Sequence, residues 1–169
     1  DITCVTGVTS VEKPSWLPLE IKCPEPNSML KELKTISKDK IDVWIHSAAV
    51  LDYVIPDPVE GKIASLQGAL DIQLAEGAKH IQELKEKCAG STRIGFKLES
   101  GIKQKDLVHR AHAQIQKSGM TATIANRIED YGKDGKPRGW LVDRHGAHFV
   151  LETESDMCDA IRSVIENNR

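Results

Sequence analysis

The chain has 169 residues, which suits one domain with a sizeable hydrophobic core. Its apolar fraction of 40% and charged fraction of 28% are ordinary for a globular protein. A formal net charge of -2 and an aromatic content of only 4% argue against a nucleic-acid-binding surface. No apolar stretch is long enough to cross a bilayer and the start lacks a signal peptide, so we expect no membrane partner.

The cysteines and histidines indicate free thiols and no metal centre. No two of the four cysteines form a CxxC pair, and no His/Cys spacing fits a zinc site. We therefore expect reduced thiols in a cytoplasmic protein with no metal ligands of its own. Because the chain begins at Asp1 without Met and is strand-like at once, we also expect a truncated or processed start, or further residues before it.

Hydrophobic periodicity predicts strands that alternate with helices. The predicted strands are residues 2–6, 19–23, 41–47, 70–74 (as an arm strand), 93–98, 122–125, and a hairpin of 139–143 with 148–152. The predicted helices follow an N-cap at Asn27, cover residues 81–88 and 103–117, and start at Asp156. This order predicts a single α/β domain over residues 1–169. Its form would be a Rossmann-like three-layer sandwich with a mostly parallel sheet and a C-terminal β-hairpin plus helix.

The carboxyl ends of the predicted strands are where ligands bind in open α/β sheets. These ends are Gly7, residues 47–53, residues 96–100 and Asn126, and we expect them to meet at one edge. The small side chains of Ala48 and Ala49 would let a ligand approach the backbone closely. The Asp52 carboxylate could accept hydrogen bonds from a ribose or a base. Each feature also has an ordinary interpretation: the two alanines could simply end a packed strand, and Asp52 could be a solvated acid in a loop.

Three further residues at this edge suit a phosphorylated ligand. Lys62 follows a proline-containing loop, where a flexible ammonium can follow phosphate charge. Phe96, one of only two phenylalanines, lies at a strand end, and Asn126 could bind a substrate amide or hydroxyl. Alternatively, Lys62 is an ordinary surface lysine, the Phe96 ring packs in the core, and Asn126 is a turn residue at the end of a strand.

Five segments at these positions, in the same order and spacing, resemble the motifs of the phosphopantothenate–cysteine ligase family. They are HSAAVLDY at 46–53, EGKIAS at 60–65, ALDIQL at 69–74, IGFKLES at 94–100 and TIANRI at 123–128. The resemblance implies a Rossmann-like, homodimeric enzyme of coenzyme A biosynthesis. It would join 4′-phosphopantothenate to cysteine through an acyl-nucleotide, using CTP or ATP with Mg²⁺. It also allows fusion to a flavin-dependent decarboxylase.

The resemblance also implies roles for single residues. Lys62 would be the catalytic lysine that contacts phosphates from a flexible loop. Ser47, Ala48, Ala49 and Asp52 would line the nucleotide-contacting strand end, Phe96 would lie beside the base, and Asn126 matches the asparagine of the last motif.

Two departures from the family pattern leave questions open. The family's glycine-rich strand–loop–helix, with "TxGGTxExID" and "NxSSGxxG" segments, has no counterpart, so we expect the domain to lack its first βα unit. Gln114 and Ser118 stand where bacterial members often carry lysines, which leaves the choice between CTP and ATP open.

Two alternatives to the ligase remain at this point. One is a non-catalytic module that binds a nucleotide or dimerises. The other is a short-chain-dehydrogenase-like oxidoreductase, whose chemistry needs Tyr-x-x-x-Lys. Tyr53 is followed by Asp57 and Tyr131 by Gly135, so neither tyrosine has the required lysine.

Overall fold

A computed structural model describes residues 1–65 and 68–168. The strands are β1 (Thr3–Thr6), β2 (Leu19–Lys22), β3 (Val43–His46), β4 (Tyr53–Val54), β5 (Ala75–Glu76), β6 (Thr92–Glu99), β7 (Ala122–Arg127), β8 (Gly139–Asp143) and β9 (His148–Leu151). The helices are α1 (Pro26–Ile36), α2 (His80–Glu83), α3 (Gln104–Ser118) and α4 (Glu154–Glu166), with a 3₁₀ turn at Ile128–Asp130.

The main sheet is mixed, so the prediction of one mostly parallel sheet is wrong in part. Its five strands run in the order β3-β6-β7-β8-β9; β3, β6 and β7 are parallel, and β8 and β9 are antiparallel additions. The β1–β2 pair is parallel but forms a sheet of its own. The predicted hairpin does form, because the Asp143 carboxylate accepts hydrogen bonds from the backbone of His145 and Ala147 at 2.8 and 3.0 Å.

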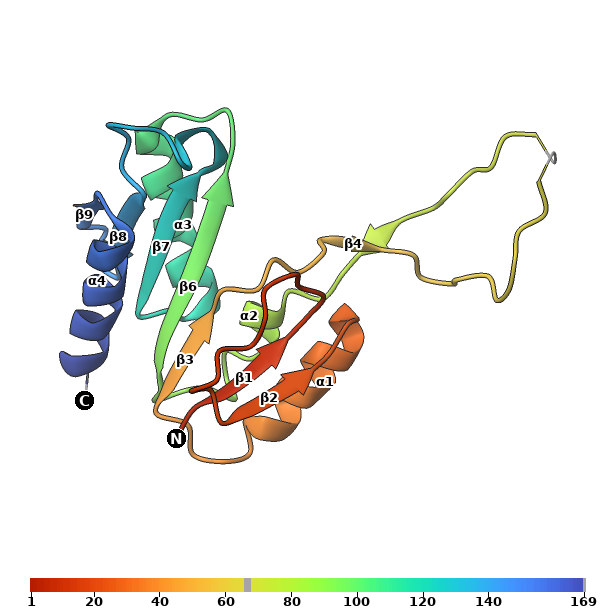
Figure 1. Ribbon diagram of the computed structural model, residues 1–169, viewed down its shortest axis with the longest axis horizontal. Coiled ribbons are helices and arrows are strands. Elements are labelled where there is room, and N and C mark those ends of the chain that lie inside the picture. The colour runs from red at the N-terminus through yellow and green to blue at the C-terminus, as the bar shows by residue number, and fades with distance from the viewer. Residues whose placement is uncertain (66–67, 169) are drawn as a thin grey trace.

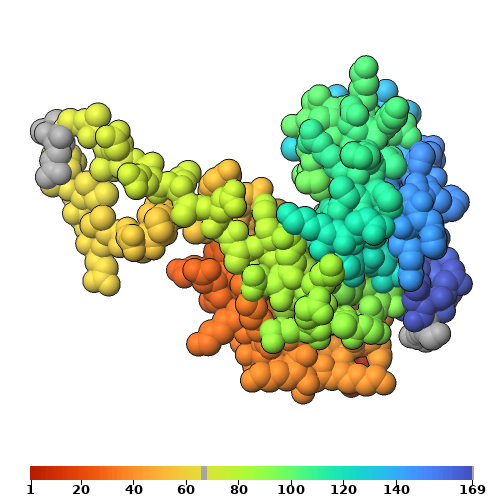
Figure 2. Space-filling view, turned by 180° about the vertical axis from the view of Figure 1, so that it is seen from behind, coloured from red at the N-terminus to blue at the C-terminus, as the bar shows by residue number. Residues whose placement is uncertain are grey.

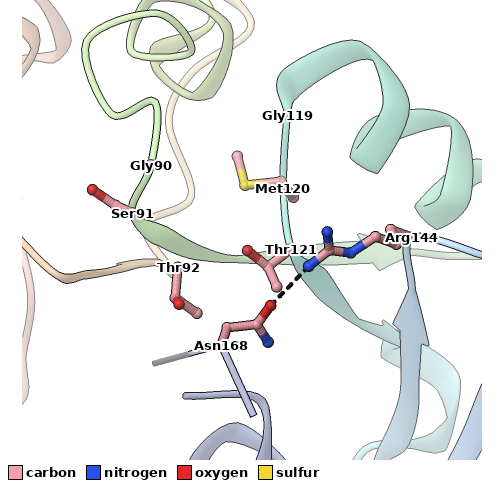
Figure 3. Close-up of a pocket in the computed structure, with 8 residues that line it drawn as sticks. All are labelled: Gly90, Ser91, Thr92, Gly119, Met120, Thr121, Arg144 and Asn168. Carbon is pink, nitrogen blue, oxygen red and sulfur yellow. Dashed lines mark hydrogen bonds between the residues drawn. The ribbon is translucent and has the colours of Figure 1, made fainter. Parts of the chain in front are cut away.

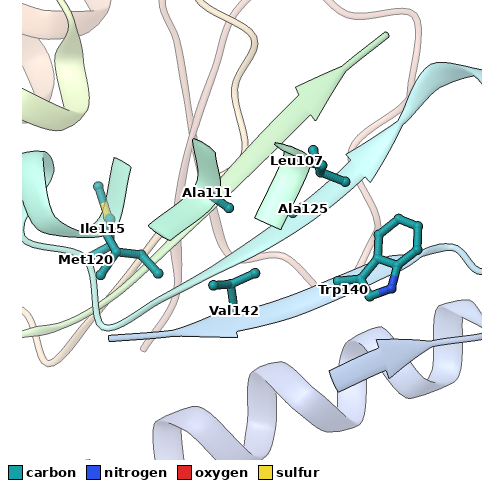
Figure 4. Packing of buried hydrophobic residues seen from close by; sticks show 7 residues of the cluster. All are labelled: Leu107, Ala111, Ile115, Met120, Ala125, Trp140 and Val142. Atoms are coloured by element: carbon teal, nitrogen blue, oxygen red, sulfur yellow. The ribbon is translucent and has the colours of Figure 1, made fainter. Parts of the chain in front are cut away.

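Helices cover both faces of the main sheet, which gives three layers (Figure 1). On the α3 face, Leu107, Ala111 and Ile115 of the helix pack against buried residues of β7 and β8 (Figure 4). On the other face, α4 covers a second cluster formed by Ile94, Ile124 and Leu151. These two clusters bury apolar residues of β6, β7 and β8, whereas Trp44 of β3 packs in a third cluster with Leu84 and Cys88.

Helix ends follow local chemistry, with two differences from the predicted starts. α3 ends at Gly119, whose φ of 65° is the left-handed conformation predicted for this glycine. α4 begins at Glu154, before the predicted Asp156, because Thr153 and Asp156 form a reciprocal capping box. α1 begins at Pro26, so Asn27 already lies inside the helix and does not cap it.

Residues 51–65 and 68–77 form an arm that projects away from the body (Figures 1 and 2). Its two halves are joined by the two-residue ladder of β4 with β5, and the predicted strand at 70–74 does not form. The arm has no packed face to hold a longer strand, and its large apolar side chains stay exposed. These are Leu51, Tyr53, Ile55, Val59, Ile63, Leu70, Ile72 and Leu74.

Within the described ranges, the helices all fall short of the length and apolarity that crossing a membrane would require.

Candidate functional site

The carboxyl ends of β3, β6 and β7 lie at one edge of the main sheet. His46, the last residue of β3, pairs with Gly95, and β6 then continues from Phe96 to Glu99 beside β7. Ser47, Ala48 and Ala49 follow β3 directly and are exposed. The edge therefore brings the alanine segment, the end of β6 and the end of β7 into neighbouring positions, because parallel strands finish on the same side.

Asn126 and its surroundings form the β7 part of this edge. Asn126 pairs with Leu98 and is half-buried, and within residues 1–65 and 68–168 its side-chain amide makes no hydrogen bond. Gly139 of β8 lies beside it, and a Cβ there would be only 2.7 Å from the carbonyl oxygen of Ala125, so no larger residue fits. The tight packing holds the strand end in place while the Asn126 amide stays available to a ligand.

Asp52 lies at the foot of the arm, where the outgoing and returning chains meet. The backbone N–H of Gly77 donates to the Asp52 carbonyl at 2.8 Å, and the Lys79 ammonium pairs with the Asp52 carboxylate. This hydrogen bond from Lys79 holds the pKa of the Asp52 carboxyl below its ordinary value. Asp52 is therefore a carboxylate that forms an ion pair with Lys79.

A second set of charges lies on β6. The Lys97 ammonium pairs with Glu99 at 2.9 Å, and Arg110 of α3 pairs with the same carboxylate at 2.8 Å. Burial alone would raise the pKa of Glu99, but the pairs with Lys97 and Arg110 outweigh it and leave the pKa below its ordinary value. Lys97 also contributes to the lowered pKa of Asp52, so the two charge pairs act on one region.

Phe96 and Lys97 point to opposite faces of the sheet, because successive side chains in a strand alternate. Phe96 is half-buried and packs against the cluster of Ile94, Ile124 and Leu151 beneath α4. Its ring thus contributes to the core, which is the ordinary interpretation of this residue. Lys97 faces the other way and reaches the charged region.

Lys62 lies in the arm and is exposed. The arm projects away from the body (Figure 2). Lys62 belongs to the arm, so it does not lie with the strand ends of its own chain. The predicted site residues therefore divide into two groups. Ser47, Ala48, Ala49, Phe96 and Asn126 share the sheet edge, with Asp52 at the arm foot, whereas Lys62 stands apart.

A buried cation lies behind the end of β3. Arg93 is 2% exposed and donates hydrogen bonds to the carbonyls of Ser118 and Ile81 at 2.6 and 2.8 Å. Its guanidinium lies 3.4 Å from Nε2 of His46. Burial, then Arg93 and His80, lower the pKa of His46 from 6.5 to about 4, so its ring is neutral at neutral pH. Among the ion pairs of the described chain, none gives Arg93 a carboxylate partner.

Lys79, Lys97 and Arg93 were not singled out by sequence reasoning. Lys97 stands inside the FKLES segment, so its position next to a strand end was a usable signal. Lys79 pairs with Asp52, 27 positions away in the sequence, and Arg93 contacts His46, 47 positions away. Contacts between such distant residues cannot be predicted from local spacing.

A hollow lies at the opposite edge of the sheet. It has a volume of about 330 Å³ and is lined by Gly90, Ser91, Thr92, Gly119, Met120, Thr121, Arg144 and Asn168 (Figure 3). Residues 90–92 and 119–121 stand at the amino ends of β6 and β7, while Arg144 follows β8 and Asn168 follows α4. Ligands of open α/β sheets bind at the carboxyl ends, so we do not assign the site to this hollow.

The three layers, with helices on both faces of a five-stranded mixed sheet, define a mixed α/β domain with a polar edge at its parallel strand ends. Comparison with known proteins identifies the family. Residues 1–167 match the model of the DNA/pantothenate metabolism flavoprotein C-terminal domain, and the chain belongs to this family. The predicted resemblance to the ligase part of coenzyme A biosynthesis enzymes is thereby confirmed, and the dehydrogenase alternative loses its support.

Two archaeal relatives agree with this family. The chain is 30% identical over 135 residues to the coenzyme A biosynthesis bifunctional protein CoaBC of Thermococcus kodakarensis, covering 79% of this chain and 33% of that protein. It is 31% identical over 134 residues to CoaBC of Methanocaldococcus jannaschii, covering 79% and 32%. The chain thus spans about a third of the length of the curated relatives it matches.

Solved structures share the fold. The DNA/pantothenate metabolism flavoprotein from Streptococcus pneumoniae superposes with a TM-score of 0.83 at 22% identity, covering 99% of this chain and 81% of that one. A Cab2 mutant in complex with phosphopantothenate-cysteine gives a TM-score of 0.66 at 18% identity, covering 89% and 52%.

Proposed function

We propose that this domain joins 4′-phosphopantothenate to L-cysteine, with CTP or ATP as the activating nucleotide, to give phosphopantothenoylcysteine in the cytoplasm. The observation that carries the proposal is the shared edge of β3, β6 and β7. That edge combines exposed small residues, the unengaged amide of Asn126 and the ammonium groups of Lys79 and Lys97. Such a set suits a ligand with phosphates and an amide or hydroxyl.

The reaction needs activation, because a carboxylate does not accept an amine until its oxygen becomes part of a good leaving group. The substrate carboxylate would attack the α-phosphate of the nucleotide, forming an acyl-nucleotide and releasing pyrophosphate. The cysteine amine would then attack the acyl carbon, releasing the nucleoside monophosphate and a proton. The domain's share is to align these groups and to neutralise phosphate charge.

The residues of the edge have distinct proposed roles. Ala48 and Ala49 would admit a ligand close to the backbone, and Asp52, held by Lys79, would accept hydrogen bonds from substrate hydroxyls. The exposed part of the Phe96 ring would touch the base while the rest packs in the core. Lys62 would contact the phosphates.

Mg²⁺ is expected to arrive with the nucleotide and not in a site of its own. The carboxylates near the edge, Asp52 and Glu99, are already paired with Lys79, Lys97 and Arg110. Within the described residues, no three Asp, Glu, His or Cys side chains are grouped to hold a metal ion. These residues do not fit a separate magnesium site, so no step is assigned to one.

The arm supports a homodimer. It exposes a row of large apolar residues that its own two strands cannot cover, and such surfaces mark contacts with another polypeptide. We propose that the arms of two copies pack together. Lys62 of each copy would then contact phosphates bound at the strand ends of the other copy. The bifunctional names of the archaeal relatives support a further link to a decarboxylase, fused or associated.

An assay of product formation tests the proposal. The domain would be incubated with 4′-phosphopantothenate, cysteine and Mg²⁺, with either CTP or ATP, and phosphopantothenoylcysteine measured by mass spectrometry. We expect product and stoichiometric pyrophosphate with one nucleotide in preference to the other. Binding of a nucleotide without product would instead support the non-catalytic module. If neither nucleotide bound, the proposed edge would not be the site.

A further inference from the structure

A polar patch lies at the end of β3, on the face of the main sheet that α3 covers. His46 pairs with Gly95 of β6, and Gly95 pairs in turn with Thr123 of β7, so these three residues share one face. A Cβ at Gly95 would lie 3.3 Å from Thr123 Oγ1 and 3.4 Å from Nε2 of Gln114 in α3. Gly95 therefore puts no side chain of its own between the His46 ring and these two polar groups.

Two oxygens of this patch are buried without a partner. In the described part of the chain, Thr123 Oγ1 and Gln114 Oε1 make no hydrogen bond, and Thr123 is fully buried. The Gln114 amide nitrogen donates to the carbonyl of Phe96 at 3.4 Å, so this side chain is directed at the end of β6. Buried polar groups are normally hydrogen-bonded, and exceptions are typical of the neighbourhood of a functional site.

Arg93 fixes the tautomer of the His46 ring. A guanidinium only donates hydrogen bonds, so the 3.4 Å contact between Arg93 Nη2 and His46 Nε2 makes Nε2 the acceptor. In a neutral imidazole the accepting nitrogen has no proton, and Nδ1 carries it. Arg93 cannot turn away, because it also donates to the carbonyls of Ser118 and Ile81. The Trp44 ring stacks on His46 with centroids 5.9 Å apart, which holds the orientation of the imidazole.

The His46 ring stays neutral beside this cation. Burial lowers its pKa, and Arg93 and His80 lower it further, to about 4. At neutral pH the Nδ1–H is therefore a hydrogen-bond donor without a net charge. A donor of this kind can bind a ligand oxygen and polarise it while keeping its own proton.

The Nδ1–H is open to a ligand. None of the described residues accepts a hydrogen bond from it, and Nδ1 is not one of the buried atoms that lack a partner, so it faces solvent. Ser47, Ala48 and Ala49, the exposed segment of the candidate site, follow His46 directly. Lys97 lies two residues beyond Gly95 on the same face. The free donor thus lies beside the groups that suit a phosphorylated ligand.

We infer that His46 is a further ligand-binding residue of the candidate site, whose Nδ1–H donates a hydrogen bond to an oxygen of the bound substrate. The acceptor would be an oxygen of the nucleotide or of 4′-phosphopantothenate, so the inference rests on the proposed function. Arg93 is then a positioning residue that acts through the His46 ring. Sequence reasoning gave His46 no role, because a histidine at a strand end has no signal until Arg93 is seen beside it.

The tautomer can be measured without a ligand. Long-range proton–nitrogen NMR correlations distinguish the protonated ring nitrogen of a histidine from the unprotonated one, and the His46 signals are assigned by their loss in His46→Gln. At neutral pH we expect the proton on Nδ1. A proton on Nε2, or on both nitrogens, would overturn the inference whether or not the domain binds a nucleotide.

Ligand binding is then followed in the same sample. CTP with Mg²⁺, ATP with Mg²⁺ and 4′-phosphopantothenate are added one at a time, and the backbone amides of Ala48 and Ala49 report binding. We expect the Nδ1–H signal of His46 to move with the ligand that supplies the acceptor oxygen, which identifies the source. Binding at Ala48 and Ala49 with no change at Nδ1 would overturn the inference and leave the proposed function standing. No binding of any of the three would overturn both.

Two variants separate a binding role from a structural one. The amide nitrogen of Asn is as many bonds from the backbone as Nδ1, whereas that of Gln matches Nε2. We expect His46→Asn to bind the ligand within about twofold of the unchanged chain, and His46→Gln to bind it about tenfold more weakly, since one hydrogen bond to the ligand is lost. Urea unfolding checks that both variants are folded. Equal losses of affinity in the two folded variants would leave His46 only a structural role and overturn the inference.

Discussion

The body and the arm show how differently two regions of one chain obtain their structure. In the body, α3 and α4 pack on opposite faces of a five-stranded sheet, and the buried residues of these two clusters are 4% exposed or less. The arm is a thin ribbon joined by two residue pairs, and its isoleucines and leucines stay exposed. The body is therefore stabilised by its own packing, whereas the arm has an apolar surface that its own two halves leave exposed.

The same substitution in the two regions gives the largest contrast. Ile115→Ala removes a side chain that is 2% exposed in the α3 cluster, and we expect a loss of about 3 kcal/mol in the free energy of unfolding. Ile72→Ala, in the arm where the side chain is 62% exposed, should change it by less than about 0.5 kcal/mol. Urea unfolding of both variants measures the difference. Equal losses would mean that the arm packs on the body.

Lys62→Ala should separate activity from stability. We expect ligase turnover to fall about 100-fold, because a charge that neutralises phosphate is lost. The free energy of unfolding should stay within about 0.5 kcal/mol of the unchanged chain, since Lys62 is an exposed arm residue. The control is Lys38→Ala, another exposed lysine beyond the end of α1, which should keep full turnover. Unchanged turnover in Lys62→Ala would remove Lys62 from the mechanism.

A mixing experiment asks whether the arm of one copy serves the edge of another. Each variant alone, Lys62→Ala or Asn126→Ala, should be inactive in the proposed mechanism. When the two are mixed and exchange subunits at random, half of the dimers contain one copy of each variant. If Lys62 acts across the dimer, each mixed dimer has one intact site. The mixture should regain about a quarter of the unchanged activity if Lys62 acts on the partner. Activity no greater than that of the two variants measured alone would place Lys62 at its own edge.

We expect acid to lower the free energy of unfolding, because His46 binds a proton more readily in the unfolded chain than in the folded one. In the unfolded chain this histidine binds a proton near pH 6.5, whereas in the folded chain its pKa is about 4. Between these values the unfolded state holds more protons, so stability present above pH 6.5 is lost as the pH falls toward 4. We expect the loss to be about 2 kcal/mol greater in the unchanged chain than in His46→Gln, by urea titration at each pH. Identical pH slopes would contradict this.

The smallest effect concerns the start of α4. Thr153→Ala removes the hydroxyl that accepts a hydrogen bond from the backbone N–H of Asp156 at 3.1 Å, and should lower the free energy of unfolding by about 1 kcal/mol. Ser155→Ala, at an exposed position two residues later, is the matched control and should have little effect. A Thr153→Ala variant as stable as the control would show that the capping box adds nothing to the body.

Prediction from the sequence succeeded where a signal is local. Apolar periodicity located the segments that form β6 and β7, and Gly119 marked the end of α3 because only glycine adopts its left-handed conformation at little cost. The order of five short motifs indicated the family. The arm strand failed, since alternation at residues 70–74 predicts a strand only if one face is covered, and there neither is.

The candidate site was predictable in part. Residues 47–49 follow β3, and Phe96 and Asn126 lie in the carboxyl-terminal halves of β6 and β7, which are parallel to β3. Their nearness to one edge could therefore be predicted from the sequence. The ion pairs and hydrogen bonds around this edge could not be predicted from strand positions. The pairing of Asp52 with Lys79, the convergence of Lys97 and Arg110 on Glu99, and the burial of Arg93 behind His46 join distant segments.

The sequence by itself determined most strands and helices of the body, the residue where α3 stops, and the family to which the chain belongs, because each depends on neighbouring residues or on motif order. Only the tertiary structure decided that the hairpin joins the sheet by antiparallel pairing of β8 with β7, that β1 and β2 stand apart from the main sheet, and that the arm, which carries Lys62, projects away from the body. The reason is that hydrophobic periodicity encodes which face of an element is buried, but not which distant element buries it.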